Sequence, residues 1–568
     1  MPTLNWIGKA TVEKHHKEVP FRLLEPMAEL SCGVADSGNL IVQGDNLHAL
    51  KALLPRYAGQ VKCIYIDPPY NTGNEGWVYN DNVNSPEIRK WLGQVVGKEG
   101  ETLDRHDRWL CMMYPRLLML KQFMHDEGMI FVSIADDEVH HLRILLDEIF
   151  GANNRVASFV WRTDGNFDNQ AKVKVCHEYV LCYARNISKL PHPKVIDPST
   201  EEGSKLFNKH IRNTIVKNGP KNPVSSVFLP RGFPADFEED EIQVKSNWPK
   251  YNSSIKVNNG KLIEGVEAES GWSSKNLLLK FIETDFKPVI DTKGQKTRFV
   301  VTSTGAIESI KERENASHVI SVLSGVGSTQ SQSATLKEMG FEFSFPKPVD
   351  LISYLISIHP DKELIVLDSF AGSGSTAEST LRQNAIDGGS RRFILIEMDE
   401  NIAQNITRDR VSKIINGYST HKGTKIQGLN TGFQFNKLSA EPLFNAEGPI
   451  RSDVTFEQLA EFVWFMETGT GLNESILNSH KKHNSPYLGQ YKDRAIFLLY
   501  NGILKDKTDI GGNVLNNRSL EVLEAGLANF VGPKVVYGAR SRFDKTKLAK
   551  LGITFHQLPY ELAVKTWF

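Results

Sequence analysis

The chain has 568 residues, of which 40% are hydrophobic and 24% are charged. These fractions are those of an ordinary globular protein, and they exclude a disordered chain, a collagen-like repeat and a disulfide scaffold. The 67 basic and 67 acidic side chains cancel, so the net charge by itself gives no sign of a nucleic-acid partner.

The cysteines and the hydropathy pattern indicate the compartment. No CxxC pair is formed by the five cysteines, Cys32, Cys63, Cys111, Cys176 and Cys182, which argues against a zinc or redox motif. The N-terminus lacks the apolar core of a signal peptide, and nowhere do about 18 apolar residues run together. We therefore expect a cytoplasmic protein, or a nuclear one, without a membrane segment.

In chain order, the first segment is polar and irregular, and we expect residues 1–37 to form an arm outside the core. From Gly38 onward, short apolar runs alternate with helical spacing, which is typical of a parallel α/β sheet covered on both faces. We predict strands at 39–45, 61–67, 128–134, 155–161 and 177–185, and helices at 46–59, 109–124 and 137–151.

The alternation is lost in residues 187–339, where Pro, Gly, Asn and Ser interrupt short β-like pieces such as 224–229, 261–266 and 297–303. We expect an inserted, irregular domain there. The stretch 203–235 contains six basic residues and no acidic one, and an acidic run follows from Asp236. Both runs are typical of solvated surface. The basic stretch is also the first candidate for phosphate contacts.

The alternation returns in residues 340–436, where we predict helices at 350–358 and 375–384 and strands at 363–370 and 391–399. Beyond residue 437, a helix at 456–467 and strands at 495–500, 534–538 and 553–558 predict a small C-terminal α/β domain. The chain is therefore predicted to be an α/β protein. Its Rossmann-like core with a mainly parallel sheet is split between 38–186 and 340–436, around the insertion at 187–339 and before the domain at 437–568.

The first motif is Asp67-Pro68-Pro69-Tyr70, directly after the apolar strand. A proline pair is also a simple way to end a strand. The position favours a function, since open α/β sheets bind ligands at the carboxyl ends of their strands. A carboxylate and a rigid backbone carbonyl can accept both hydrogens of an exocyclic base amine and so aim its lone pair at an electrophile. The tyrosine offers a flat face for an extruded base.

The second motif runs from Asp368 to Ala377 and is a predicted strand–loop–helix junction with the pattern G-x-G-x-x-A. Glu397 ends the next predicted strand, where it can accept hydrogen bonds from a ribose diol. Alone, this pattern fits a nicotinamide-binding fold, a methyl-donor site or a tight packing turn.

Together the two motifs resemble the β-class of amino-methyltransferases that act on adenine in DNA. In that family, Asp-Pro-Pro-Tyr precedes an F-x-G-x-G loop, and a target-recognition region separates them. Further matching segments are Gly44-Asp45-Asn46, Asn71-Thr72-Gly73, residues 128–138, residues 177–185 and Phe345-Pro346-Lys347-Pro348. One departure is Ser369, where the family usually has proline. Aspartate at position 67 resembles the adenine-modifying members more than the cytosine-N4 members.

The resemblance implies a site-specific DNA adenine-N6 methyltransferase that flips its target base, uses S-adenosyl-L-methionine and needs no metal. Asp67 and the Pro68 carbonyl would hold the amine, Pro69 would fix the loop and Tyr70 would stack on the adenine. Phe370, Gly372 and Gly374 would line the methionine half of the cofactor above Asp368, and Glu397 would bind the ribose. The remaining implied cofactor residues are Asp45, Asn46, Asp67, Lys347 and Pro348.

The additional C-terminal residues resemble the modification subunit of type III restriction–modification systems. This resemblance implies double-stranded DNA as substrate, a homodimer, and a helicase–nuclease restriction subunit as partner. The alternatives are an orphan DNA adenine methyltransferase, a methyltransferase acting on RNA or on a protein glutamine, and a nicotinamide dehydrogenase. The methyltransferase on RNA or on a protein glutamine explains Asp67 poorly. The dehydrogenase does not explain the Asp-Pro-Pro-Tyr motif. His125, His140 and His141 lack metal-ligand spacing, so we expect no metal site there.

Overall fold

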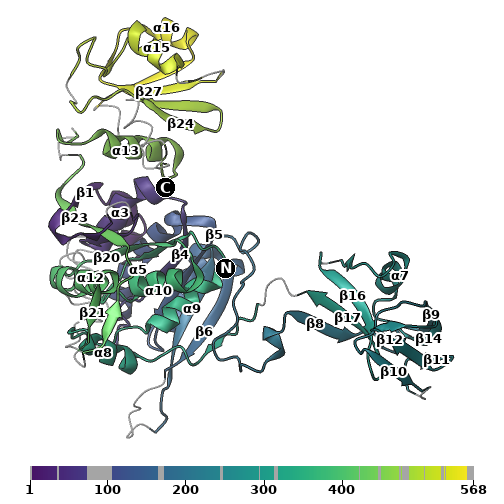
Figure 1. Cartoon of the computed structure of the whole chain (residues 1–568). Helices are drawn as coiled ribbons and strands as arrows, with labels where there is room; N and C mark the ends of the chain where they lie inside the picture. Colours follow the sequence, from purple (N-terminus) through teal and green to yellow (C-terminus); the bar gives the residue numbers. More distant parts are fainter. Residues whose placement is uncertain are drawn as a thin grey trace. The chain divides into compact units, whose positions relative to one another are not determined.

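A computed structural model describes residues 3–34, 37–72, 105–163, 172–243, 247–292, 294–312, 317–420, 423–444, 450–472, 475, 485–503, 506–525, 527, 530 and 532–558. Gly73 of the predicted motif lies outside these ranges. The chain forms two compact units (Figure 1). The larger comprises Met1–Pro193, Asp197–Ser199 and Val319–Phe568, and the smaller comprises Lys194–Ile196 and Thr200–His318. Among the described residues, no helix has the length and apolarity needed to cross a membrane.

The larger unit is built around one sheet of eleven strands in the order β1-β23-β3-β20-β19-β4-β5-β7-β6-β18, with β2 paired to β23. The strands are β1 (Arg22–Pro26), β2 (Cys32–Gly33), β3 (Leu40–Gln43), β4 (Val61–Ile66), β5 (Met124–Ile134), β6 (Arg155–Arg162), β7 (His177–Ala184), β18 (Val322–Leu323), β19 (Ile365–Asp368), β20 (Arg392–Glu397) and β23 (Gly432–Pro442). Neighbours from β23 to β5 run parallel, whereas β1, β2 and β7 run antiparallel to theirs. The predicted mainly parallel α/β sheet is confirmed.

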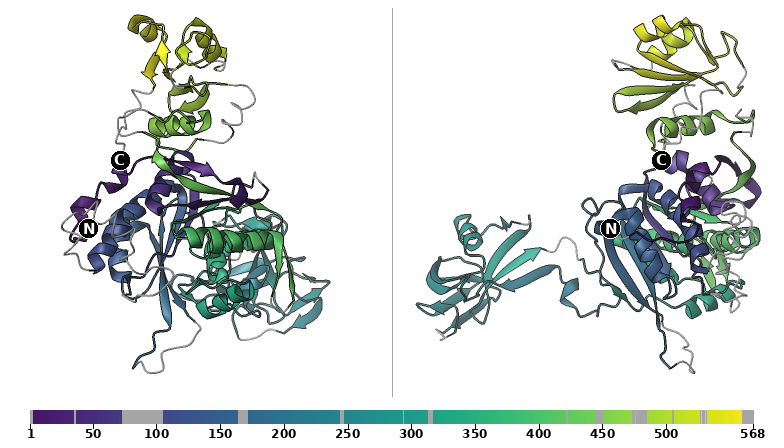
Figure 2. Two further views of the ribbon diagram at one scale, coloured as in Figure 1. Left: turned by 90° about the vertical axis from the view of Figure 1, so that its left-hand side faces the viewer. Right: turned by 180° about the vertical axis from the view of Figure 1, so that it is seen from behind.

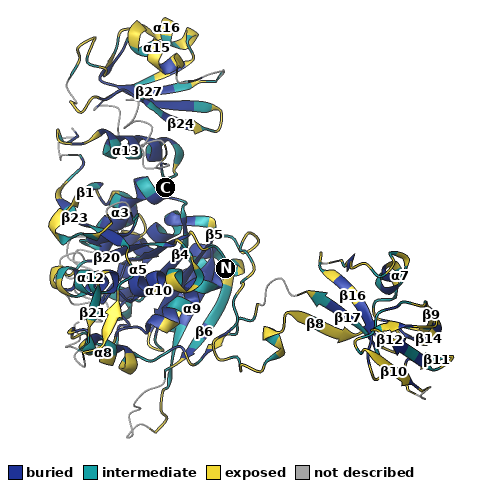
Figure 3. Ribbon diagram, viewed as in Figure 1, coloured by how far each residue is buried: buried dark blue, intermediate teal, exposed yellow. Residues whose placement is uncertain are grey.

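Helices cover both faces of this sheet (Figure 2). They include α3 (Asn46–Tyr57), α5 (Arg105–Phe123), α6 (Val139–Leu146), α8 (Thr329–Glu338), α9 (Val349–Ile358), α10 (Ser375–Asp387), α11 (Glu400–Ile402) and α12 (Arg408–Asn416). In β20, Ile394 and Ile396 belong to the core that contains α3 and α5, whereas Phe393 and Leu395 belong to the core that contains α10 and α12. Because side chains alternate along a strand, a strand covered on both faces is apolar throughout, and the central strands are accordingly buried (Figure 3).

The N-terminal segment belongs to the core, which corrects the expected arm at 1–37. After the short helices α1 (Lys9–Val12) and α2 (His15–Glu18), β1 pairs with β23 and places Leu24 opposite Leu438. Val12 and Phe21 are buried in the core that contains α3. A short strand whose partner lies near the other end of the core sequence has no local pattern, so the sequence did not identify it.

The smaller unit is β-rich and has its own core, which corrects the expectation of an irregular insertion. Its strands form the sheets β15-β16-β17-β8, β11-β14-β9 and β10-β12-β13. The elements are β8 (His210–Thr214), β9 (Val224–Leu229), β10 (Glu239–Ile242), β11 (Lys250–Tyr251), β12 (Ile255–Asn258), β13 (Lys261–Leu262), β14 (Val266–Gly271), α7 (Lys275–Glu283), β15 (Val289–Ile290), β16 (Lys296–Val301) and β17 (Ile307–Glu312).

The centre of the smaller unit is aromatic. Phe281 packs edge to face against Phe233 and Phe299, with ring centroids 6.0 and 5.5 Å apart. Strands as short as these pair through tertiary contacts and show no clear period in the sequence. The unit is also shorter than the predicted insertion, since Leu336 of α8 lies in a core of the larger unit.

The C-terminal part of the larger unit contains the predicted helix and strands. α13 (Phe456–Thr468) is followed by a sheet in the order β24-β25-β27-β29, of which the last three run parallel. Its further elements are β24 (Tyr487–Tyr491), β25 (Arg494–Leu498), β26 (Val514–Leu515), α15 (Asn517–Ala525), β27 (Lys534–Gly538), β28 (Arg540–Ser541), α16 (Lys545–Lys550) and β29 (Ile553–Gln557). Glu467 of α13 pairs with Arg494 at 2.9 Å and accepts the Tyr537 hydroxyl at 2.7 Å. The predicted boundary at residue 437 lies inside β23.

Candidate active site

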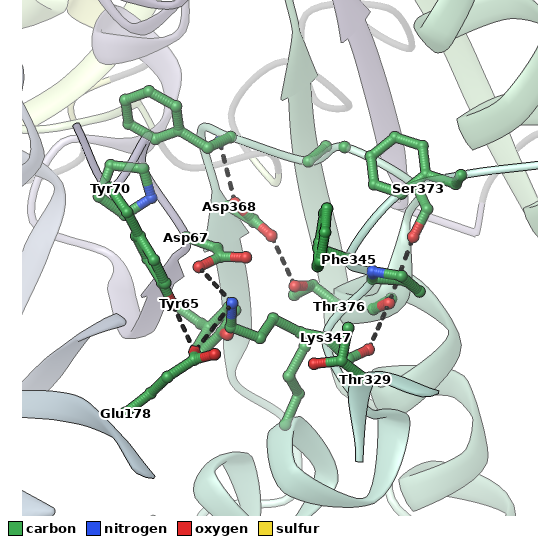
Figure 4. Close-up of a pocket in the computed structure, with 18 residues that line it drawn as sticks. Tyr65, Asp67, Tyr70, Glu178, Thr329, Phe345, Lys347, Asp368, Ser373 and Thr376 are labelled. Carbon is green, nitrogen blue, oxygen red and sulfur yellow. Dashed lines mark hydrogen bonds and ion pairs between the residues drawn. The ribbon is translucent and has the colours of Figure 1, made fainter. Parts of the chain in front are cut away.

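The two sequence motifs meet at the carboxyl edge of the central sheet. β4 and β19 are neighbouring parallel strands, with Ile64 opposite Leu367. Asp67, directly after β4, and Asp368, at the end of β19, therefore lie at the same edge. Residues of both motifs line one cavity with an empty volume of about 710 Å³ (Figure 4). Its place is that of a ligand pocket in an open α/β sheet.

Seven of the predicted site residues line this cavity: Asp67, Pro68, Tyr70, Lys347, Asp368, Phe370 and Gly372. Asp45, Asn46, Pro69, Pro348, Gly374 and Glu397 are not in its lining. The lining also contains residues to which the sequence assigned no role, among them Glu178, Thr329 and Phe345. Glu178 lies in the matching segment 177–185, where it is an acidic residue near the start of the strand β7.

The Asp-Pro-Pro-Tyr loop is held by side chains on both sides. Trp109 donates its indole N–H to the Pro69 carbonyl at 2.7 Å. Tyr70 is buried and donates its hydroxyl to Oε2 of Glu178 at 2.8 Å. Two prolines and these two anchors restrict the loop, so the Asp67 carboxylate has a defined position in the cavity.

Lys347 lies between two carboxylates (Figure 4). Its Nζ is 3.1 Å from Oδ1 of Asp67 and 3.3 Å from Oε2 of Glu178, and it lies 4.5 Å from the ring centroid of Tyr70. The resemblance placed Lys347 on the cofactor side. Its ammonium group instead contacts Asp67, because that carboxylate is an oppositely charged neighbour in a buried site.

Asp67 and Lys347 shift each other's pKa. Burial raises the pKa of Asp67 above its usual value, and the positive charge of Lys347 opposes this increase. Burial disfavours the charged form of Lys347, but Asp67 and Glu178 outweigh this effect and raise its pKa. The raised pKa of Lys347 keeps its ammonium group charged beside the Asp67 carboxyl group.

The glycine-rich loop connects β19 to α10. Oδ1 of Asp368 accepts the backbone N–H of Phe370 at 2.9 Å, and Oδ2 accepts the Thr376 hydroxyl at 2.5 Å. Burial raises the pKa of Asp368 to about 7. Gly374 has a φ of 80°, and a Cβ at this position would lie 3.3 Å from Cγ2 of Thr407. Both the backbone conformation and the packing therefore favour glycine there.

Glu397 holds this loop from the next strand. Its Oε2 accepts the backbone N–H of Gly372 at 2.8 Å, and its Oε1 accepts the N–H of Asp399 at 3.0 Å. Burial raises the pKa of Glu397 to about 7. Each carboxylate oxygen has a further lone pair, so these bonds leave acceptor capacity for a ribose hydroxyl.

Asp45 and Asn46 connect α3 to the same loop. Asp45 caps α3, and the Asn46 amide donates to the Ser369 carbonyl at 3.3 Å. The buried Arg116 fixes both residues, since its Nε donates to Oδ1 of Asn46 at 2.5 Å and its guanidinium lies 3.4 Å from the Asp45 carboxylate. Ser369 contributes a backbone carbonyl that a proline would also offer, so this departure from the family pattern preserves the contact.

A buried arginine that the sequence did not single out supports the loop from α12. Arg410 is fully buried, and its Nε donates to Glu378 at 2.9 Å. One terminal nitrogen donates to the carbonyl and the hydroxyl of Ser373 at 3.0 and 2.7 Å, and to the Ser375 hydroxyl at 3.0 Å. An arginine in an amphipathic helix usually faces water, so only the packing reveals this role.

Among the described residues, one cluster has the composition of a metal site: His106, Glu138 and His141. His125 and His140 are not part of it. Nδ1 of His106 lies 2.5 Å from Oε1 of Glu138, and Nδ1 of His141 lies 2.9 Å from Oε2. These are hydrogen-bond distances, so two histidines bonded to a buried carboxylate explain the cluster without an ion.

A protein-family model described as DNA methylase matches residues 61–408. Over 424 residues the chain is 31% identical to the type III restriction-modification enzyme EcoPI Mod subunit of Escherichia phage P1, an alignment that covers 70% of this chain and 64% of that relative. Over 452 residues it is 29% identical to the EcoP15I Mod subunit of Escherichia coli, with 74% and 67% covered. The chain thus spans about two thirds of the length of these relatives.

Among solved structures, the PvuII DNA methyltransferase (cytosine-N4-specific) matches with a TM-score of 0.32 and 11% identity, covering 67% of this chain and 93% of that chain. The family match extends over more than half of the 568 residues and includes both motifs of the cavity. The chain belongs to the DNA methylase family.

Proposed function

We propose that this chain is a cytoplasmic, site-specific DNA adenine methyltransferase. It transfers a methyl group from S-adenosyl-L-methionine to the exocyclic amine of an adenine extruded from duplex DNA. The observation that carries this proposal is the single cavity in which the Asp67 carboxylate faces the glycine-rich loop. Membership of the DNA methylase family and the similarity to two Mod subunits support it.

The residues around the loop fit S-adenosyl-L-methionine. Gly372 lines the cavity, and because it has no Cβ its backbone can approach a ligand there. The buried hydroxyl of Ser369 has no hydrogen-bond partner among the described residues. The cofactor would be held by Asp368, Phe370, Gly372, Gly374 and Glu397. When bound, it supplies an electrophilic methyl group on a sulfonium.

The chain itself positions the amine. Asp67 accepts one amine hydrogen and the Pro68 carbonyl accepts the other, which turns the nitrogen lone pair towards the electrophile. The hydrogen bond from Trp109 to Pro69 keeps the loop in place. Because burial raises the pKa of Asp67, this carboxylate is also a suitable acceptor for the proton that the amine loses. Tyr70 provides the ring for base stacking.

We assign catalysis to the sheet core of the larger unit, target recognition to residues 200–318 of the smaller unit, and partner contacts to the C-terminal residues 437–568. The separate core of the smaller unit supports an independent recognition module. Two similar proteins are named as Mod subunits, which supports a type III modification subunit that forms a homodimer and binds a helicase–nuclease subunit.

The test is labelled methyl transfer from S-adenosyl-L-methionine to double-stranded DNA. Replacing Asp67→Ala removes the acceptor of the amine, and we expect the rate to fall by about 10²–10³-fold or more. The control is Asp126→Ala, because Asp126 is an exposed aspartate that pairs with Lys189 at 2.5 Å. Transfer that persists in Asp67→Ala, or that occurs on RNA alone, would contradict the proposal.

A further inference from the structure

Lys347 has two anionic partners in the cavity, although one carboxylate is enough to neutralise its ammonium group. Its Nζ is 3.1 Å from Asp67 and 3.3 Å from Glu178. The Lys347 side chain is 7% exposed, and the two carboxylates are each 23% exposed. Both carboxyl groups lie within contact distance of the same ammonium group, so the lysine can exchange partners without a large movement.

The proposed reaction makes this second partner necessary. The Oδ1 of Asp67 that faces Lys347 lies in the cavity where the target amine must bind. A neutral amine that takes this position displaces the ammonium group from Asp67. Leaving a buried ammonium group without a counter-charge is strongly unfavourable, but Glu178 already lies within contact distance.

Glu178 also orients the neighbouring aromatic ring of Tyr70. Tyr70 donates its hydroxyl to Oε2 of Glu178 at 2.8 Å, the same oxygen that lies 3.3 Å from Lys347. This contact orients the ring on which the base would stack. The Glu178 carboxylate therefore contacts both Lys347, which pairs with Asp67, and Tyr70, on which the base would stack.

We propose that Glu178 is a positioning residue of this active site, which takes over Lys347 when the target amine occupies Asp67 and which orients the ring of Tyr70. The inference rests on the proposed methyl transfer to adenine. In this arrangement, the ammonium group of Lys347 occupies the position of the target amine until the amine displaces it. Without Glu178, the lysine stays on Asp67 and competes with the substrate.

The first test is Glu178→Gln in the full chain. Glutamine keeps an oxygen for the Tyr70 hydroxyl and removes the counter-charge of Lys347. We expect kcat for methyl transfer to fall about tenfold or more, the order of a hydrogen bond to a charged group. The matched control is Glu148→Gln, since Glu148 pairs with Lys9 at 2.7 Å with a similar exposure of 22%, away from the cavity.

The decisive variant is the double change Glu178→Gln with Lys347→Met. It removes the cation that would compete for Asp67, so we expect it to be about threefold or more faster than Glu178→Gln alone. If Glu178 only supported the fold, the double variant would be slower than Glu178→Gln alone, because a second buried substitution would destabilise the protein further. A double variant no faster than the single variant would overturn the inference.

A second measurement separates amine capture from base extrusion. Duplex DNA with 2-aminopurine at the target position has no amine on C6, so its fluorescence reports extrusion without a contact to Asp67. We expect Glu178→Gln to keep the fluorescence increase while transfer to adenine falls. Loss of both signals would overturn the proposed role. A wild-type chain that methylates no DNA would instead contradict the proposed function itself.

Discussion

Arg410→Met tests the buried support of the glycine-rich loop. In the native chain, Arg410 is fully buried and its guanidinium lies 2.7 Å from Oε2 of Glu378, which is itself 1% exposed. Methionine keeps much of the apolar stem and removes the hydrogen bonds that Arg410 donates to Glu378, Ser373 and Ser375. The variant therefore leaves a buried carboxylate beside a loop that has lost its anchor.

The structure sets the size of this effect. Breaking a buried ion pair by removing one partner costs about 3–5 kcal/mol. Arg382 still lies 2.7 Å from Oε1 of Glu378, so we expect the lower end of that range, about 3 kcal/mol of unfolding free energy. At about 2 °C per kcal/mol for a large domain, the melting temperature should fall by about 6 °C.

The pH dependence has a definite sign. Burial raises the pKa of Glu378, but Arg410 and Arg382 outweigh it and hold that pKa below its usual value. Native Glu378 thus stabilises the fold at neutral pH and loses this effect as the pH falls. In Arg410→Met, Glu378 keeps only Arg382 as a cationic partner, so its pKa rises and protonation relieves part of the cost of burying its charge. The difference in stability between the two proteins should shrink as the pH falls.

Differential scanning calorimetry of the full chain and calorimetric titration with S-adenosyl-L-methionine measure these effects. We expect a lower transition temperature and weaker cofactor binding in Arg410→Met. The double variant Glu378→Gln with Arg410→Met buries no unpaired charge and should regain part of the lost stability. An unchanged transition temperature in the single variant, or a double variant that is less stable than it, would refute the reasoning.

Two further predictions concern the site and the smaller unit. Lys347→Met removes the charge that opposes the raised pKa of Asp67 and leaves Glu178 beside it, so that pKa should rise further. Because Asp67 must be ionised to accept the amine, the acid limb of the kcat/KM profile should move to higher pH. An acid limb that stays at the same pH in Lys347→Met would contradict the effect of Lys347 on the pKa of Asp67. Replacing residues 200–318 of the smaller unit by the corresponding segment of a relative should change the methylated sites, as read by single-molecule sequencing. Unchanged sites would locate recognition elsewhere.

Sequence alone was sufficient where the cause of structure is local. The run 63–66 is apolar and buried because both faces of its strand are covered, and a proline pair follows at 68–69. The sequence placed Asp-Pro-Pro-Tyr at the carboxyl end of a strand, and the structure brings the glycine-rich loop to the same edge because parallel strands share their carboxyl ends. That meeting is the feature from which the function follows.

Tertiary structure decided everything that depends on partners distant in the sequence. It placed Lys347 on Asp67, brought Glu178 to both Lys347 and Tyr70, and buried Arg410 under the loop. It also paired β1 with β23 and gave the smaller unit its own core. Such contacts leave no periodic trace along the chain, because the side chains involved have ordinary local neighbours and obtain their charge partners only when the sheet forms.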